Sequence, residues 1–136
     1  MTTFLKKYLG KLLVPIAWTI FMGILLTLPG SMLPNEASFQ IPQFDKLVHI
    51  GMFGGFVFLW NLYLSNRQHT PKKLLRLFFC VFVLGVIYGI GSEYVQKHVP
   101  GRDFDEADII ADMIGASLAY GISNMMLLFP PTSSTD

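Results

Sequence analysis

The amino-acid sequence predicts an all-α integral membrane protein, a bundle of four transmembrane helices with both chain termini in the cytoplasm. Three observations lead to this prediction. Hydrophobic residues make up 52% of the 136 residues and charged residues 14%, a composition unlike that of most soluble domains. Four apolar stretches follow one another along the chain. The basic residues gather mainly on one side of these stretches.

The apolar stretches are each about as long as a membrane-spanning helix. They run over about 12–28, 47–64, 74–96 and 109–129. Crossing the hydrocarbon core takes about 20 apolar residues, or somewhat fewer with interfacial flanks. Because lipid offers the backbone no hydrogen-bond partners, each stretch is expected to be helical despite its Val, Ile and Phe residues. We therefore expect one transmembrane domain over residues 1–129, followed by a disordered tail at 130–136.

The first apolar stretch, with lysines ahead of it, also resembles a signal peptide. No small-x-small cleavage site follows it, and the sequence TLPGSMLP is typical of a turn where a helix leaves the membrane. We therefore expect this stretch to be retained. The next segment, rich in Pro, Gly, Ser and Asn, is expected to be a surface loop.

The distribution of basic residues orients the bundle, because Lys and Arg near helix ends tend to stay on the cytoplasmic side. Seven of them fall on the side of the chain termini and three on the other side: Lys6, Lys7, Lys11, Arg67, Lys72, Lys73 and Arg76, against Lys46, Lys97 and Arg102. This bias predicts cytoplasmic termini in the cell membrane, with nearly all carboxylates at the outer face. The net charge of +1 gives no reason to expect a nucleic-acid partner.

Small residues spaced four apart predict close contacts between the helices. Such pairs occur in the second and third stretches, Gly51 with Gly55 and Gly85 with Gly89, and the fourth stretch has Gly115. In lipid, small residues at this spacing let two backbones approach. We therefore expect a compact bundle rather than four separate anchors.

Two polar residues, Asp45 and His49, stand four apart where the second stretch begins, so they share one helix face. Asp45 is expected to cap this helix. His49, about one turn inside an apolar helix, needs a partner, which either Asp45 or a carboxylate of another helix can supply. A structural and a functional role for His49 both remain open.

Capping explains only some of the carboxylates around the fourth stretch. Asp105 is expected to cap that helix, and Asp108 to benefit from the helix dipole. Asp112 is about one turn deeper, and Glu93 ends the third stretch. Neither is explained by capping, and ionisable groups inside a membrane are candidates for a functional site. Arg102 is the expected counter-charge, either clamping Asp108 or Glu93 or facing outward to bind a phosphate.

The chemistry of this polar end is not fixed by a known motif. No GxSxG or P-loop sequence is present. A metal site would need His49, Glu93, Asp108 and Asp112, with or without His98, but no HExxH or cysteine-pair spacing supports it, so no metal or cofactor is expected. Acid–base catalysis is compatible with a histidine beside buried carboxylates. A carrier would place its charges nearer the membrane midplane.

The polar spacing resembles that of the VanZ-like family of small multi-pass membrane proteins. The pattern is Glu93-x2-Gln96-x5-Arg102-x5-Asp108-x3-Asp112-x2-Gly115, with PGR at 100–102 and DK plus His49 in the second stretch. The likeness covers residues 44–121. The family usually has Asn where this chain has Asp112, so the charge state of Asp112 stays open, and a glycine is common where it has Ala119. The polar site implied by the resemblance consists of Asp45, Lys46, His49, Glu93, Gln96, Arg102, Asp108 and Asp112.

The resemblance implies a link to low-level resistance to the glycopeptide antibiotic teicoplanin, with no assigned biochemical activity. We expect an extracytoplasmic site that binds an envelope component, a lipid-linked cell-wall precursor or a lipoglycopeptide, with membrane lipids around the bundle. One alternative is a membrane-embedded enzyme acting on a lipid head group, with Glu93 or Asp108 as base and His49 as its partner. Another is a structural role for the polar residues, with function in a protein partner. The sequence predicts no oligomeric state.

Overall fold

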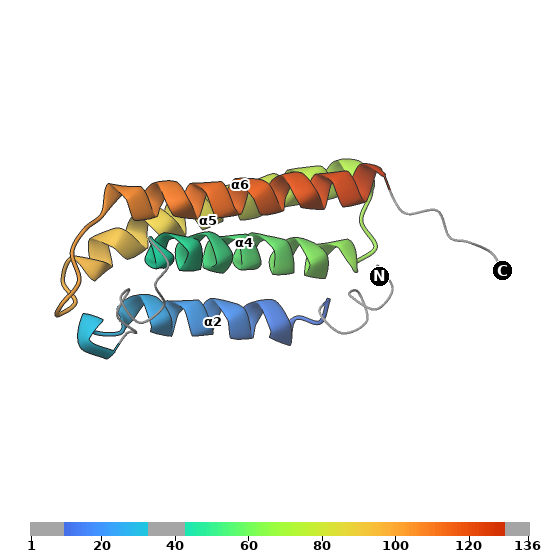
Figure 1. Cartoon of the computed structure of the whole chain (residues 1–136). Coiled ribbons are helices and arrows are strands. Elements are labelled where there is room, and N and C mark those ends of the chain that lie inside the picture. Colours follow the sequence, from blue (N-terminus) through green and yellow to red (C-terminus); the bar gives the residue numbers. More distant parts are fainter. Residues whose placement is uncertain (1–9, 33–42, 130–136) are drawn as a thin grey trace.

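The computed structural model describes residues 10–32 and 43–129, and this part of the chain is all-α (Figure 1). The predicted all-α class and the four predicted helices are confirmed. The predicted tail at 130–136 lies outside the described residues. The elements are α2 (Leu13–Thr27), the short 3-10 helix η1 (Gly30–Met32), α4 (Phe44–Ser65), α5 (Pro71–Gln96) and α6 (Glu106–Leu128).

Three of the four helices are long and apolar enough to cross a membrane. They are α4, α5 and α6, with 22, 26 and 23 residues. Helix α2 is apolar but has only 15 residues. At about 1.5 Å per residue it is about 22 Å long, less than the roughly 30 Å of a hydrocarbon core. The described chain therefore has three candidate membrane spans. The fourth span and the orientation of the termini stay predictions.

Helices α4, α5 and α6 each begin before the apolar stretches do, because their polar first turns are helical as well. The Thr70 hydroxyl accepts a hydrogen bond from the Lys73 amide at 3.4 Å, and proline stands at the first position of α5. Asp105 caps α6 as predicted, its Oδ1 accepting from the Ala107 amide at 2.8 Å. The predicted cap by Asp45 is wrong. Gln43, with a positive φ of 56°, precedes α4 without a side-chain cap, and Asp45 lies in the first turn.

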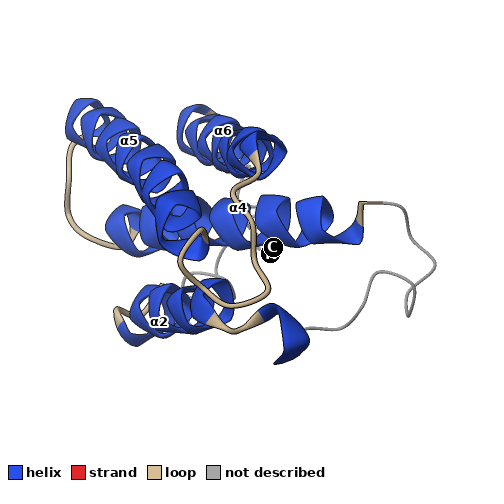
Figure 2. Cartoon of the chain, turned by 90° about the vertical axis from the view of Figure 1, so that its left-hand side faces the viewer, coloured by secondary structure: helices blue, strands red, loops and turns tan. Residues whose placement is uncertain are grey.

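The four helices pack lengthwise, and Figure 1 shows their relative directions. Helices α4 and α6 run in the same direction, cross at an oblique angle and are in extensive contact, while α2 and α5 run the opposite way. Helix α2 packs on α4 and α5, as the end-on view of Figure 2 also shows. The starts of α4 and α6 therefore meet the ends of α2 and α5 at one end of the bundle.

Glycines set how closely α4, α5 and α6 approach. A Cβ atom added to Gly115 would collide with the carbonyl oxygen of Ile50 on α4. One added to Gly89 would lie 2.8 Å from Oδ2 of Asp112. These two contacts confirm the predicted packing by small residues. The prediction is wrong for Gly51, because a Cβ there would have no described neighbour within 4 Å.

The core of the bundle is apolar, and so is much of its outer surface. Phe53 and Val57 on α4 are fully buried against neighbours that include Met22 of α2. On the outside, large apolar side chains such as Leu84 and Leu118 are 59% and 57% exposed. Helices that are apolar on both their inner and outer faces are typical of membrane spans.

Candidate functional site

A group of polar side chains occupies the end of the bundle where α4 and α6 begin and α5 ends. Most of its members are nearly inaccessible: His49 is 2%, Glu93 0%, Asp108 7% and Asp112 1% exposed. Buried polar groups at the ends of apolar helices need partners, so their contacts determine what the site can do. We call this group the polar cluster, and it consists of Asp45, Lys46, His49, Glu93, Asp105, Asp108 and Asp112.

Lys46 is the cation that links α4 to α6. Its Nζ donates to Oδ2 of Asp45 at 2.9 Å, to Oδ2 of Asp105 at 2.7 Å and to Oδ1 of Asp108 at 2.7 Å. An ammonium group has three donors, so these carboxylates use all of them. The hydrogen bonds from the Lys46 ammonium and the Ala107 amide hold the pKa of the Asp105 carboxyl below its usual value.

Arg102 does not clamp a carboxylate, so the predicted clamp is wrong. One of its terminal nitrogens points instead to the carbonyl of Leu25 on α2, at 3.5 Å, and its Nε is buried without a partner among the described residues. The reason lies in the loop before it. Gly101 has a φ of 73°, and the Gly30 amide donates to the Pro100 carbonyl at 3.0 Å, which attaches this loop to the end of α2.

His49 finds its partner on another helix, which is one of the two predicted alternatives. Its Nδ1 lies 2.8 Å from Oδ1 of Asp112, a hydrogen bond between α4 and α6. Its Nε2 lies 3.8 Å from Oδ2 of Asp108, too far for a hydrogen bond. The pair with Asp112 fixes the position of the imidazole ring.

Glu93 is held by the loop that leads into α6. Its Oε2 accepts a hydrogen bond from the backbone amide of Asp105 at 3.2 Å. Its Oε1 is buried and has no hydrogen-bond partner in the described part of the chain, and the same is true of Oδ2 of Asp112. Two carboxylate oxygens from different helices therefore remain unsatisfied inside the cluster.

Six of the eight predicted site residues come together, and two do not. Gln96 is buried but donates from Nε2 to the carbonyl of Leu26 at 3.1 Å, which ties α5 to α2, and Arg102 also turns to α2. His98, just beyond the end of α5, is exposed, and its Nδ1 pairs with the carbonyl of Tyr94 on that helix. Sequence reasoning assigned Asp105 only a capping role, whereas it also contacts Lys46 and Glu93.

Sequence reasoning also missed Asn61. This residue of α4 is 1% exposed, and neither atom of its side-chain amide has a partner among the described residues. A single uncharged polar residue in an apolar stretch gave no spacing signal. Its burial marks it as a second polar position in the membrane-spanning part of α4.

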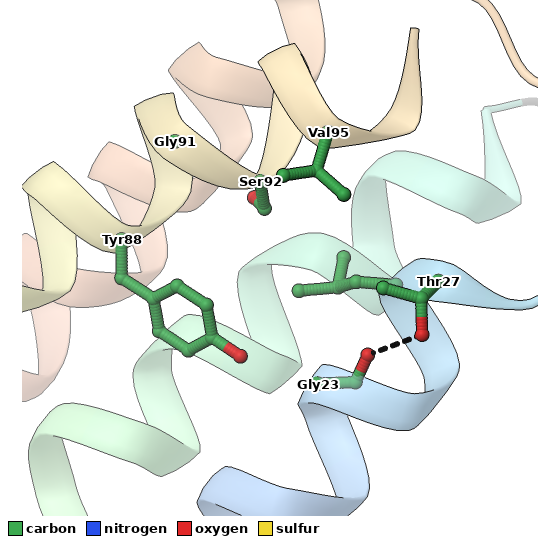
Figure 3. Close-up of a pocket in the computed structure, with 7 residues that line it drawn as sticks. Gly23, Thr27, Tyr88, Gly91, Ser92 and Val95 are labelled. Atoms are coloured by element: carbon green, nitrogen blue, oxygen red, sulfur yellow. Dashed lines mark hydrogen bonds between the residues drawn. The ribbon is translucent and has the colours of Figure 1, made fainter. Parts of the chain in front are cut away.

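An apolar groove of about 330 Å³ lies between α2 and α5 (Figure 3). Two hydroxyl groups at its wall are satisfied locally: Thr27 donates to the Gly23 carbonyl at 2.9 Å and Ser92 to that of Gly89 at 2.7 Å. Ser92 is followed in the chain by Glu93, so the groove and the cluster both draw residues from the last turns of α5. We call it the α2–α5 groove; its lining residues are Gly23, Leu26, Thr27, Tyr88, Gly91, Ser92 and Val95.

The cluster favours cations and hydrogen-bond donors over free anions. Five carboxylates face one ammonium group and one imidazole, and the positive ends of the α4 and α6 dipoles offset only part of this charge. Among the described side chains of the cluster there is no hydroxyl or thiol nucleophile. The site is therefore equipped to bind a polar group or an ion and to move a proton through His49.

Comparison with known proteins places the chain in one protein family. The VanZ/LLP1 family matches residues 3–128. A protein of Schizosaccharomyces pombe that is described as uncharacterized is 34% identical over 116 residues, which are 84% of this chain and 60% of that protein. The chain therefore spans only about 60% of the length of this relative. No solved structure matches the chain.

Proposed function

The chain belongs to the VanZ/LLP1 family, and from this premise we propose that it binds a lipid-linked component of the cell envelope. The polar head group would lie at the polar cluster and the lipid tail in the α2–α5 groove. The observation that carries the proposal is that an apolar groove and a buried polar cluster share the last turns of α5, where Ser92 lines the groove and Glu93 belongs to the cluster. A molecule with a polar head and an apolar tail matches both surfaces at once.

The head group has specific partners available at this end of the bundle. Arg102 stands next to α2 through the Leu25 carbonyl and makes no ion pair with a described carboxylate, so its guanidinium charge is not neutralised within the described residues. Guanidinium groups bind phosphate well. Carboxylates of the cluster accept hydrogen bonds from sugar hydroxyls and peptide amides. These features fit a lipid-linked cell-wall precursor or a lipoglycopeptide such as teicoplanin.

The charge bias of the loops supports an outward-facing site in the cell membrane. The cluster lies at the opposite end of the helices from the Lys- and Arg-rich segments, including Lys72 and Lys73 at the start of α5. Basic segments are retained in the cytoplasm, so the cluster would face the extracytoplasmic side. There it would meet envelope precursors and external glycopeptides.

Native mass spectrometry of the purified full chain tests the proposal. Gly91 lines the groove, and a Cβ added there meets no described atom within 4 Å, so Gly91→Phe fills the groove without a clash at the backbone. Gly121 of α6 is equally open and lies outside the groove, so Gly121→Phe is the matched control. We expect a co-purifying lipid to be reduced about tenfold or more in Gly91→Phe only. Equal lipid content in both variants contradicts the proposal.

The hydrogen bond between His49 and Asp112 favours catalysis on a lipid head group as a second candidate function. A histidine held by a buried carboxylate is the usual arrangement of a general base, and Asp108 or Glu93 can act beside it. Turnover would then show a bell-shaped pH dependence that is lost in His49→Gln. Lipid binding without turnover by the unmodified chain would exclude this second candidate.

A further inference from the structure

Three potential metal ligands converge from three helices inside the polar cluster. They are His49 of α4, Glu93 of α5 and Asp112 of α6, and one donor atom of each lies within 4.8 Å of the other two. Their exposed fractions are 2%, 0% and 1%. An imidazole nitrogen and two carboxylate oxygens form a donor set that divalent transition metals accept.

Two oxygens of this group lack the partner that burial demands. Glu93 Oε1 and Asp112 Oδ2 are inaccessible and accept no hydrogen bond from any described residue. An unsatisfied acceptor in the interior is costly, and a charged one more so. The nearest ammonium group, that of Lys46, already has its three donors committed to other carboxylates. The group of His49, Glu93 and Asp112 therefore has more negative charge and more hydrogen-bond acceptors than the described residues around it satisfy.

A second acidic group in the same cluster shows how such an excess is balanced. Asp45, Asp105 and Asp108 also bring carboxylate oxygens within 4.8 Å of one another. Each of the three contacts the Lys46 ammonium at 2.7 to 2.9 Å. One carboxylate group thus has its cation in the chain itself, and the neighbouring group has none.

We propose that His49, Glu93 and Asp112 bind one divalent transition-metal ion, with Zn²⁺ as the best match. The two positive charges balance the two carboxylates. The imidazole ligand favours Zn²⁺ or Mn²⁺ over Mg²⁺ and Ca²⁺, which prefer ligand sets made of oxygen. Three protein ligands leave a coordination position for water or a polar ligand. The ion would lie among the starts of α4 and α6 and the end of α5, and so would join three helices.

This inference stands apart from the proposed lipid binding, because every donor comes from the chain itself. Gly89 supports it by leaving room for the Asp112 carboxyl against α5, where any larger residue would place a Cβ 2.8 Å from Oδ2. The competing account is that a proton on Glu93 or Asp112 satisfies the orphan oxygens without a metal. The following experiment separates the two.

Metal content and affinity are measured on the full chain in detergent by mass spectrometry of metals and by Zn²⁺ titration. We expect about one ion per chain. Glu93→Gln and Asp112→Asn remove a ligand without changing side-chain size, and should each weaken Zn²⁺ binding by at least about tenfold. The matched controls are Glu106→Gln and Asp103→Asn, exposed carboxylates at the same end, which should bind Zn²⁺ like the unmodified chain.

A second measurement avoids dependence on how well the variants fold. Co²⁺ added to the unmodified chain should give the visible absorption bands of a nitrogen- and oxygen-ligated ion, and Zn²⁺ should displace it and raise the melting temperature. The proposal is overturned if the unmodified chain neither binds Co²⁺ nor responds to Zn²⁺. It is also overturned if Glu93→Gln raises the melting temperature without metal while Zn²⁺ has no effect, because a proton then satisfies the carboxyl. Loss of binding in Asp45→Asn but not in Asp112→Asn would place any ion elsewhere.

Discussion

His49 and Asp112 are 63 positions apart in the sequence, yet a hydrogen bond of 2.8 Å joins Nδ1 of the first to Oδ1 of the second. It lies deeper in the bundle than the contacts of Lys46, because both residues are about one helical turn beyond their more exposed neighbours on α4 and α6. Helices α4 and α6 are therefore connected by two polar layers, an outer one around Lys46 and an inner one around His49.

Removal of the outer layer should destabilise the protein. Lys46→Met leaves Asp105 and Asp108 without their ammonium partner, and the Lys46 side chain is only 21% exposed. Because the site is partly accessible to solvent, we expect a loss of about 2 kcal/mol in the free energy of unfolding. Denaturant unfolding in detergent measures it. Lys97→Met, at an exposed lysine of the same end, is the control and should change little.

Alanine at two glycines of α6 should have opposite effects on stability. Gly→Ala inside a helix usually stabilises by up to about 1 kcal/mol. Gly121 faces open space in the described structure, so Gly121→Ala should follow this rule. In Gly115→Ala the new Cβ collides with the Ile50 carbonyl, which must push α4 and α6 apart. A lower melting temperature for Gly115→Ala and an unchanged or higher one for Gly121→Ala are the expected results; two equal shifts would show that the helices do not approach so closely.

The stability of the protein should fall in acid through Asp105. Its pKa is held below the usual value of 3.8 by the Lys46 hydrogen bond and then by that of Ala107. A carboxyl with a lowered folded-state pKa contributes stability above its unfolded pKa, and this contribution is lost as the pH falls through the folded pKa. Asp105→Asn should therefore be less stable at neutral pH and lose less stability below about pH 4. Melting temperatures across the pH range, with Asp103→Asn as the control, test this; parallel curves for Asp105→Asn and the unmodified chain would refute it.

The position of the Asp112 carboxyl should depend on Gly89. Gly89→Ala leaves every proposed metal ligand in the chain but places a Cβ 2.8 Å from Oδ2 of Asp112, so that carboxyl must move. We expect weaker Zn²⁺ binding in this variant. Gly91→Ala, two residues along α5 and facing open space in the described structure, should bind Zn²⁺ like the unmodified chain. Zn²⁺ titration measures the affinity of both variants. Equal affinities would show that the position of the Asp112 carboxyl does not affect Zn²⁺ binding.

The sequence predicted the helices and the members of the site better than their pairings. Apolar stretches and turn signals located all four helices, and capping preferences found Asp105. Arg102 was expected to clamp either Asp108 or Glu93, but the loop turns it toward α2, and Lys46 pairs with Asp108 instead. Which cation meets which carboxylate depends on helix rotation and loop path, and spacing within one helix carries no information about either.

The span of α2 shows a second limit of sequence reasoning. Its apolar stretch is nearly as long as the second one, yet its helix ends at Thr27, with the extended Leu28 and the 3-10 turn Gly30–Met32 after it. A proline and a glycine follow at 29 and 30, and they end the helix where the chain meets the loop around Pro100. Hydropathy gives the length of the apolar stretch. Where the helix ends depends on the proline, the glycine and the contact with the loop around Pro100, which hydropathy does not detect.

The long sequence separation within the cluster has a consequence for how the chain is made. Lys46 and His49 on α4 are synthesised 59 to 63 residues before their partners on α6. Before α6 is made, the His49 imidazole lacks Asp112, and the Lys46 ammonium lacks Asp105 and Asp108. A chain that stops after α5 would therefore lack these partners for Lys46 and His49. The site is complete only once α6 has been made.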